Sequence, residues 1–400
     1  MAQRRGTLAS IAAEVGVSRT TVSNAYNHPD QLSTELRERI LAAARARGYT
    51  GPDPTARSLR TRQAGAVGVI LTEHLAYAFE DQASIDFLAG LSESSAGAGN
   101  ALTLIPLGPN QGSGLSPLVA SALVDAFVVY SVPQSEPHLD AVLARGVPVV
   151  VCDQPYPGGA SGPAGAAGPA GVAGAAFVGI DDAAAIAPAA RALVEAGHRR
   201  IGIVGKRLFR EESRDGIVTA AEVAGADMHV QRGRIQGALD VFAEAGISDV
   251  PVVTRHFNDH ASAVDAAREL FAHAPDLTAV LCTTDSMAFG VLDYCASAGL
   301  DVPGDVSVTG FDGVEQALAR GLTTVIQHNK RKGETVGQVL TELLEADVSD
   351  GSDGRNDRNG KNDSDGRDGG DAVAQPDAPP RVILPTEFSP GRTVAPPRAR

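Results

Sequence analysis

The segment Leu8-Ala9-Ser10-Ile11-Ala12-Ala13-Glu14-Val15-Gly16-Val17-Ser18, near the start of the 400-residue chain, determines how its first part folds. The apolar residues recur at the spacing of a helix, and the preceding Thr7 can cap that helix. Gly16 can adopt the left-handed turn that ends it, and Ser18 can cap a second helix. A third periodic stretch begins at Ser33. The segment therefore predicts a bundle of three short helices, with a tight turn before the second.

The second helix keeps short polar side chains on one face and turns Val22 and Ala25 inward. Such side chains match base edges in the major groove, where Arg pairs with guanine and Asn with adenine. The alternative is a surface helix with an ordinary polar face. The DNA-binding candidates in this part are Thr7, Ser18, Arg19, Thr20, Thr21, Ser23, Asn24 and Asn27.

The charge distribution favours DNA binding. Residues 1–65 contain ten arginines and five acidic residues, which gives them a net charge of +5. The whole chain carries −14, so the remainder carries −19. Attraction to phosphate is therefore confined to the first part, because the acidic remainder repels a nucleic acid.

Several strings, in this order, resemble the LacI/GalR (lac repressor) family of bacterial transcription regulators. The resemblance implies an N-terminal helix-turn-helix DNA-binding domain and a two-lobed α/β core similar to a periplasmic sugar-binding protein. It also implies a repressor that acts as a homodimer on a near-palindromic double-stranded operator, under the control of a small-molecule effector between the lobes. The strings are residues 7–12, 16–23, 37–40, 56–60, 197–202, 285–290 and 302–312.

Residues 55–62 match the family segment that folds into a hinge helix on specific DNA. Leu59 matches the leucine that is wedged between base pairs in the minor groove, and the flanking Arg57 and Arg60 would bind phosphates. The alternative is that Leu59 packs on the core. Residues 50–54 are one residue longer and richer in proline than the family's usual connection, so the start of the hinge helix is open.

From residue 65 onward, apolar strand-like runs alternate with amphipathic stretches, which predicts parallel sheets flanked by helices. The length exceeds what one hydrophobic core usually encloses, so we expect two lobes. The predicted boundaries are a DNA-binding domain at 1–52, a hinge at 53–64 and an effector-binding core at 65–400. The first lobe is expected at about 65–196 and 329–346, and the second at about 197–328 and 379–400.

Ligands of such sheets collect at the carboxyl ends of the strands. By resemblance, Arg214 and Asp285 would hold the ligand; an interlobe salt bridge or a helix cap is the alternative. Gln327 and Asn329 match pocket-lining positions in the last crossing between the lobes. The effector-binding candidates, including possible walls of the pocket, are Tyr77, Phe79, Arg214, Phe257, Asn258, Asp285, Gln327 and Asn329.

Two insertions interrupt the family pattern. Residues 157–175 are nearly all Gly, Pro and Ala, which predicts a flexible loop. Residues 347–378 are rich in Asp and Gly and have almost no apolar content, so we expect disorder before a terminal strand at 381–384.

Signatures of other classes are weak. Gly202–Lys206 lacks the spacing of a phosphate loop, and His256 and His260 lack the glutamate of a metalloprotease motif. The three cysteines predict buried thiols in a reducing cytoplasm, and we expect no enzyme activity, no metal, no cofactor and no membrane segment. The alternative function is a cytoplasmic ligand-binding or sugar-processing protein that does not bind DNA. The identity of the effector, and whether it releases or strengthens DNA binding, stay open.

Overall fold

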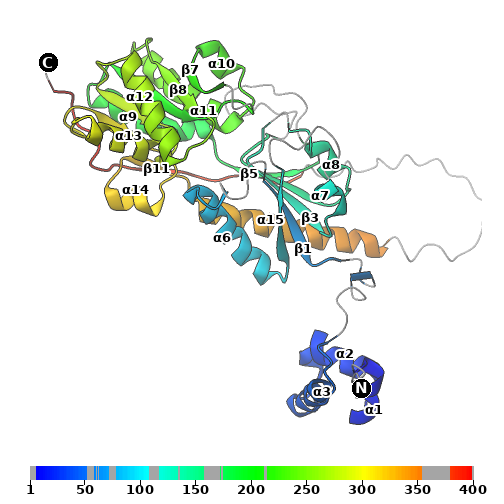
Figure 1. Cartoon of the computed structure of the whole chain (residues 1–400). Helices are drawn as coiled ribbons and strands as arrows, with labels where there is room; N and C mark the ends of the chain where they lie inside the picture. The colour runs from blue at the N-terminus through cyan, green and yellow to red at the C-terminus, as the bar shows by residue number, and fades with distance from the viewer. Residues whose placement is uncertain are drawn as a thin grey trace, which may run out of the picture. The chain divides into compact units, whose positions relative to one another are not determined.

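The structure is a computed structural model. It describes residues 6–51, 58–59, 61, 63–71, 78–107, 117–133, 136–156, 172, 174–210, 214–353 and 379–398. The chain forms two compact units, Met1–Gly65 and Ala66–Arg400 (Figure 1).

The first unit contains the predicted three helices, α1 (Leu8–Val15), α2 (Arg19–Asn27) and α3 (Thr34–Ala46), with a 3₁₀ turn at Pro29–Gln31. Thr7 and Ser10 form a capping box on α1, and Gly16 ends that helix at a φ of 74°. Ser18 accepts a hydrogen bond from the Thr21 backbone at the start of α2. The helices close on a small apolar core that consists of Ile11, Ala12, Val22, Ala25, Ile40 and Ala44.

The second unit begins with a parallel sheet of six strands, which forms the first lobe. The strand order is β12-β5-β4-β3-β1-β2. Its strands are β1 (Ala66–Leu71), β2 (Ala101–Pro106), β3 (Ala126–Tyr130), β4 (Val149–Cys152), β5 (Ala176–Gly179) and β12 (Arg381–Ile383). Its helices are α6 (Gln82–Gly97), α7 (Pro117–Ser121), α8 (Leu139–Leu143) and α15 (Asn329–Asp353).

A sheet of five strands forms the second lobe, in the order β10-β9-β6-β8-β7, with only β7 antiparallel to its neighbour. Its strands are β6 (Ile201–Lys206), β7 (Gly216–Val218), β8 (Val252–Arg255), β9 (Ala279–Cys282) and β10 (Ser307–Thr309). Its helices are α9 (Asp182–Glu195), α10 (Ala220–Ala224), α11 (His229–Glu244), α12 (His260–His273), α13 (Asp285–Ser297) and α14 (Glu315–Arg320). The predicted α/β core with two lobes and parallel sheets is confirmed.

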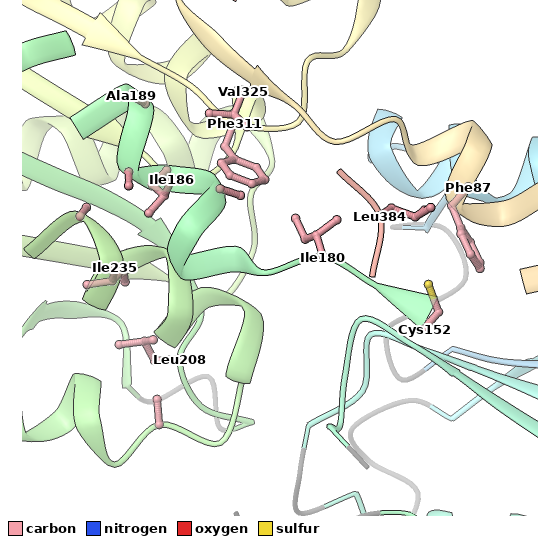
Figure 2. Packing of buried hydrophobic residues seen from close by; sticks show 14 of the residues in the cluster. Phe87, Cys152, Ile180, Ile186, Ala189, Leu208, Ile235, Phe311, Val325 and Leu384 are labelled. Carbon is pink, nitrogen blue, oxygen red and sulfur yellow. The ribbon is translucent and has the colours of Figure 1, made fainter. Parts of the chain in front are cut away.

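The chain crosses between the lobes after β5, after β11 (Thr324–Ile326) and after β12, and β11 pairs with β13 (Glu387–Ser389). The apolar core is continuous across these crossings. Figure 2 shows Ile180 between Leu384 and Phe87 on one side and Ile186 and Phe311 on the other.

Two segments lie in a different lobe from the one expected from the sequence. We expected α9 in the first lobe, but it packs against α11 of the second. Gly237 permits this packing, because a Cβ there would lie 2.4 Å from the carbonyl oxygen of Ala183. We expected β12 in the second lobe, but it pairs with β5 in the first sheet. The first crossing therefore lies near Ile180 and not near residue 196.

The insertion expected to be disordered from residue 347 begins as helix, because α15 continues to Asp353. Extending an existing helix needs no new nucleus, so a few residues of weak propensity can follow it. Residues 354–378 lie outside the described part, as does most of 157–175. Among the described residues, no helix is long and apolar enough to cross a membrane.

Candidate nucleic-acid face and effector pocket

The outer face of α2 presents the polar side chains predicted to read DNA. Arg19 and Thr20 are exposed at its first turn. Asn24 is half-buried and donates a hydrogen bond to the Oε1 of Gln31 at 3.0 Å, which fixes the orientation of its amide. Asn27 donates to the Oγ of Ser23 at 3.1 Å. The 3₁₀ turn after α2 and the helix itself therefore hold the amides of Asn24 and Asn27 in place.

The hinge is described only in part. Ser58, Leu59 and Thr61 have helical backbone, and the side chain of Leu59 is 78% exposed. An exposed leucine of this kind has no core contact to lose on inserting into a groove. Arg57, Arg60 and the effector candidate Tyr77 lie outside the described residues.

A cavity of about 80 Å³ lies between the two lobes of the second unit. A single buried water requires roughly 10–15 Å³ on this kind of measure, so the cavity has room for a small organic molecule. Both lobes contribute polar groups to it. The lining includes Asp81, Ser84, Tyr130, Ser131 and Asp153 from the first lobe, Lys206, Gln231, Arg234, Asn258, Thr284 and Asp312 from the second, and Gln327 from a crossing.

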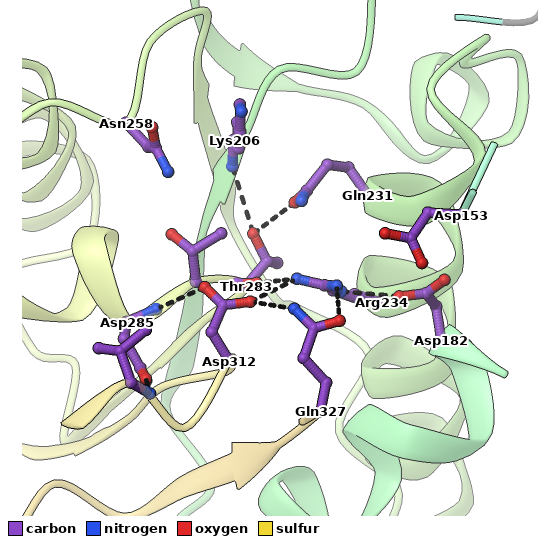
Figure 3. A network of polar contacts seen from close by, with 12 residues as sticks. Asp153, Asp182, Lys206, Gln231, Arg234, Asn258, Thr283, Asp285, Asp312 and Gln327 are labelled. Carbon is purple, nitrogen blue, oxygen red and sulfur yellow. Dashed lines mark hydrogen bonds and ion pairs between the residues drawn. The ribbon is translucent and has the colours of Figure 1, made fainter. Parts of the chain in front are cut away.

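Arg234 of α11 is the central cation of the second lobe's wall (Figure 3). Its Nε donates to Asp182 at 2.8 Å, and its Nη1 donates to the carbonyl oxygen of Thr283 at 2.9 Å. Asp312 lies 3.4 Å from the same Nη1. Burial opposes the charge of Arg234, but these two carboxylates raise the pKa of the guanidinium overall.

Lys332 of α15 supplies a second buried cation, from the first lobe. Its Nζ lies 2.8 Å from Asp153 and donates to the Oε1 of Gln327 at 2.7 Å. The same Oε1 is 3.5 Å from the Nη2 of Arg234, and the Gln327 amide donates to Asp312 at 2.6 Å. Gln327 therefore connects the charged groups of the two lobes at the crossing.

Asp285 supports the pocket from behind. It is fully buried and accepts hydrogen bonds from Thr324 Oγ1 at 2.6 Å and from the Val314 backbone at 3.0 Å. Its backbone N–H donates to Asp312 at 3.4 Å. Burial and the neighbouring Asp312 raise the pKa of Asp285. The side chain thus holds the loop that carries Asp312 in place.

Backbone strain is concentrated around the cavity. Ser131, Asp153 and Asp312 all have positive φ, at 51°, 66° and 123°, and all three line it. Non-glycine residues adopt such conformations at a cost, and they persist mainly at functional sites. Ser131 follows β3 and Asp153 follows β4, so their strained backbones direct side chains toward the ligand space at the carboxyl ends of the strands.

The sequence-predicted effector residues are only partly gathered here. Asn258 and Gln327 line the cavity, and Asn329 lines a second, more open one beside it. The remaining described candidates, Phe79, Arg214, Phe257 and Asp285, are outside the cavity lining. Arg214 lies over the ring of Phe209 at 4.3 Å, Phe257 packs edge-on against His256, and Phe79 is 54% exposed.

The guanidinium that lines the cavity belongs to Arg234, whereas Arg214 lies outside the lining. Sequence reasoning also missed Asp153, Asp312 and Lys332. For Asp153 a signal existed, because it directly follows the apolar run of β4. Lys332 gave none, since a lysine within a polar helical stretch is usually solvated.

Comparison with known proteins agrees with this architecture. Residues 7–51 match a family model described as bacterial regulatory proteins, lacI family, and residues 190–356 match a periplasmic binding protein-like domain. The chain is 48% identical over 399 residues to the HTH-type transcriptional regulator IpsA of Corynebacterium glutamicum, covering 98% of this chain and 99% of that protein.

Solved structures show the same fold. The transcriptional regulator CelR in complex with cellobiose aligns with a TM-score of 0.62 at 22% identity, over 98% of this chain and 100% of that one. The lac repressor dimer bound to operator and an anti-inducer aligns with a TM-score of 0.70 at 20% identity, with the same coverage.

Proposed function

This chain belongs to the LacI family of bacterial transcription regulators, and we propose on that premise that it is a repressor controlled by a sugar or related metabolite. The chain is a sequence-specific DNA-binding regulator. The proposal adds the sign of regulation, the class of effector and the residues that carry both. It also places the protein in the cytoplasm, where its operator is accessible.

The observation that carries the effector class is the pairing of charges in the pocket. Arg234 is paired with Asp182 and Asp312, and Lys332 is paired with Asp153. A ligand with a net charge would have to displace one of these partners and leave a buried ion behind. A neutral molecule with several hydroxyls can instead donate to the carboxylates and accept from Asn258 or Lys206. CelR, which shares the fold, was solved with a neutral sugar, cellobiose.

The DNA side of the proposal rests on the exposed face of α2 and on Leu59. Arg19, Thr20 and Asn24 would contact base edges in the major groove, and Leu59 would enter the minor groove between Arg57 and Arg60. The lac repressor was solved as a dimer on its operator. We infer a homodimer here that places two α2 helices on the half-sites of a near-palindrome.

Two experiments test the proposal. Selection of bound duplexes from a random library should return a near-palindrome, and binding should weaken steeply with salt because phosphate contacts release counterions. A thermal-shift screen should find neutral polyhydroxylated compounds that stabilise the protein, since a ligand stabilises the state that it binds. Stabilisation by charged metabolites alone would refute the effector class.

A further inference from the structure

Gln154 follows the strained Asp153 at the end of β4 in the first lobe, and its side chain is wholly buried. A buried amide has to place both a donor and an acceptor group, or it destabilises the fold. Its partners therefore show what it does. They lie in the second lobe as well as in its own.

The side-chain oxygen of Gln154 accepts a hydrogen bond at the start of α11. Its Oε1 accepts from the Val230 backbone N–H at 2.9 Å, and its Nε2 lies 3.7 Å from the sulfur of Met228 and 3.5 Å from the Oγ of Ser131. Among the described residues, Met228 precedes α11 without giving it a side-chain cap. The first turn of a helix leaves N–H groups that need an acceptor from elsewhere. Gln154 supplies one from the opposite lobe.

The capped turn belongs to the effector pocket. Gln231 and Arg234, one and four residues after Val230, both line the cavity. Gln231 accepts from Thr283 Oγ1 at 2.6 Å, and Arg234 holds Asp182 and Asp312. A shift of the first turn of α11 would therefore move the polar groups that face the ligand.

Asn258 and Arg210 make polar contacts across the same seam within the described part of the chain, and both contacts are longer. Asn258 donates to Asp81 at 3.4 Å, and Arg210 lies 4.0 Å from Glu136. The hydrogen bond from the Val230 N–H to Gln154 is the shortest of the three, and it satisfies a backbone donor. We therefore expect its loss to destabilise the lobe interface more than the loss of either longer contact.

We propose that Gln154 is a positioning residue, which caps α11 across the lobe interface and so completes the effector site only when the lobes are closed. The proposal rests on the proposed function, because it names how that site is assembled. It predicts that the lobes are held together partly by the protein's own side chains. Ligand binding then adds to a closure that Gln154 already favours.

The test uses the full chain without ligand and compares the parent with Gln154→Met, which removes the acceptor. Gln236→Met is the matched control, because Gln236 is exposed on the same helix and donates to Asp240. Hydrogen exchange of the segment 228–233 reports the cap. A pocket thiol, introduced as Ser84→Cys in each background, reports closure through its rate of reaction with a disulfide reagent. The natural cysteines are buried.

We expect Gln154→Met to speed both exchange and thiol reaction about three- to thirtyfold, the range for loss of a helix cap. Gln236→Met should resemble the parent. Unchanged exchange in Gln154→Met, or equal acceleration in Gln236→Met, would overturn the cap. Faster exchange with an unchanged thiol rate would overturn the link to closure. Failure of the parent chain to bind duplex DNA would refute the proposed function and leave these readouts intact.

Discussion

The outer face of α2 and the pocket between the lobes are both polar, but they satisfy their polar groups in different ways. On α2, Arg19 and Thr20 point to solvent, and water satisfies them until a partner arrives. In the pocket, Arg234 and Lys332 are buried and are satisfied by carboxylates of the chain itself. The exposed groups of α2 can therefore contribute to binding without contributing to the stability of the fold. The buried groups of the pocket contribute to both.

This difference has a consequence for mutation. Removing an exposed polar group that contacts only DNA should change the affinity for DNA and leave the stability of the fold unchanged. Removing one member of a buried network leaves its partners unpaired in a low-dielectric site, so stability falls as well.

Replacement of Arg234 by Met should lower the free energy of unfolding of the core by about 3–5 kcal/mol, because Asp182 and Asp312 would stay buried without their cation. Urea unfolding followed by circular dichroism measures it. The control is Arg200→Met, at the exposed pair of Arg200 with Asp276, where the loss should stay below about 1 kcal/mol. Equal small losses at both sites would show that the pocket network does not stabilise the fold.

Asp182 makes stability depend on pH. Burial, only partly offset by Arg234, raises its pKa from 3.8 to about 6, so the folded state holds a proton more tightly than the unfolded chain. Its contribution to stability is full below pH 4 and is lost as the pH rises through about 6, up to about 3 kcal/mol. As the pH rises from 4 to 6, the free energy of unfolding of the parent should therefore fall relative to that of Asp182→Asn, whose residue 182 does not titrate. Parallel curves over this window would contradict the assigned pKa.

Leu59→Ala should weaken binding to the specific operator by about 2–3 kcal/mol, the value for burying a leucine side chain. Binding to non-specific duplex should hardly change, because the wedge needs a correctly seated hinge. Fluorescence anisotropy with operator and scrambled duplexes separates the two. An equal loss on both would remove the wedge role.

Thr20→Ala should have the smallest effect, a loss of about 1 kcal/mol in operator affinity, at the low end for a base contact. Its free energy of unfolding should change by less than about 0.5 kcal/mol, as for most exposed positions. Anisotropy and urea unfolding on the same preparation give both numbers. A loss of stability larger than the loss of affinity would break the contrast with Arg234.

The sequence predicted the first unit well, because its signals are local. The caps at Thr7 and Ser18 and the turn at Gly16 lie where the pattern puts them. The alternation of strands and helices likewise predicted the two parallel sheets. These features depend on neighbours within a few residues, which the sequence displays directly.

The residues of the pocket were harder to predict from the sequence, because they lie far apart in it and come together only in the folded chain. Arg234 sits within a helix and reads as a surface residue, while Arg214 in an acidic string attracted the ligand role. Lys332 and Asp153 are 179 positions apart, and the sequence around neither residue predicts that they form an ion pair. The lobe of α9 was misplaced for the same reason, since β6, β7 and α10 separate it from its partner α11 in the sequence.

The most direct test of the account measures operator affinity of the full chain with and without the compound that stabilises it best in the thermal-shift screen. Coupling between the pocket and the DNA-binding unit predicts a change of roughly 5- to 150-fold, and the operator should change the affinity for that compound by the same factor. A compound that binds the core and leaves operator affinity unchanged would contradict control of DNA binding by the pocket.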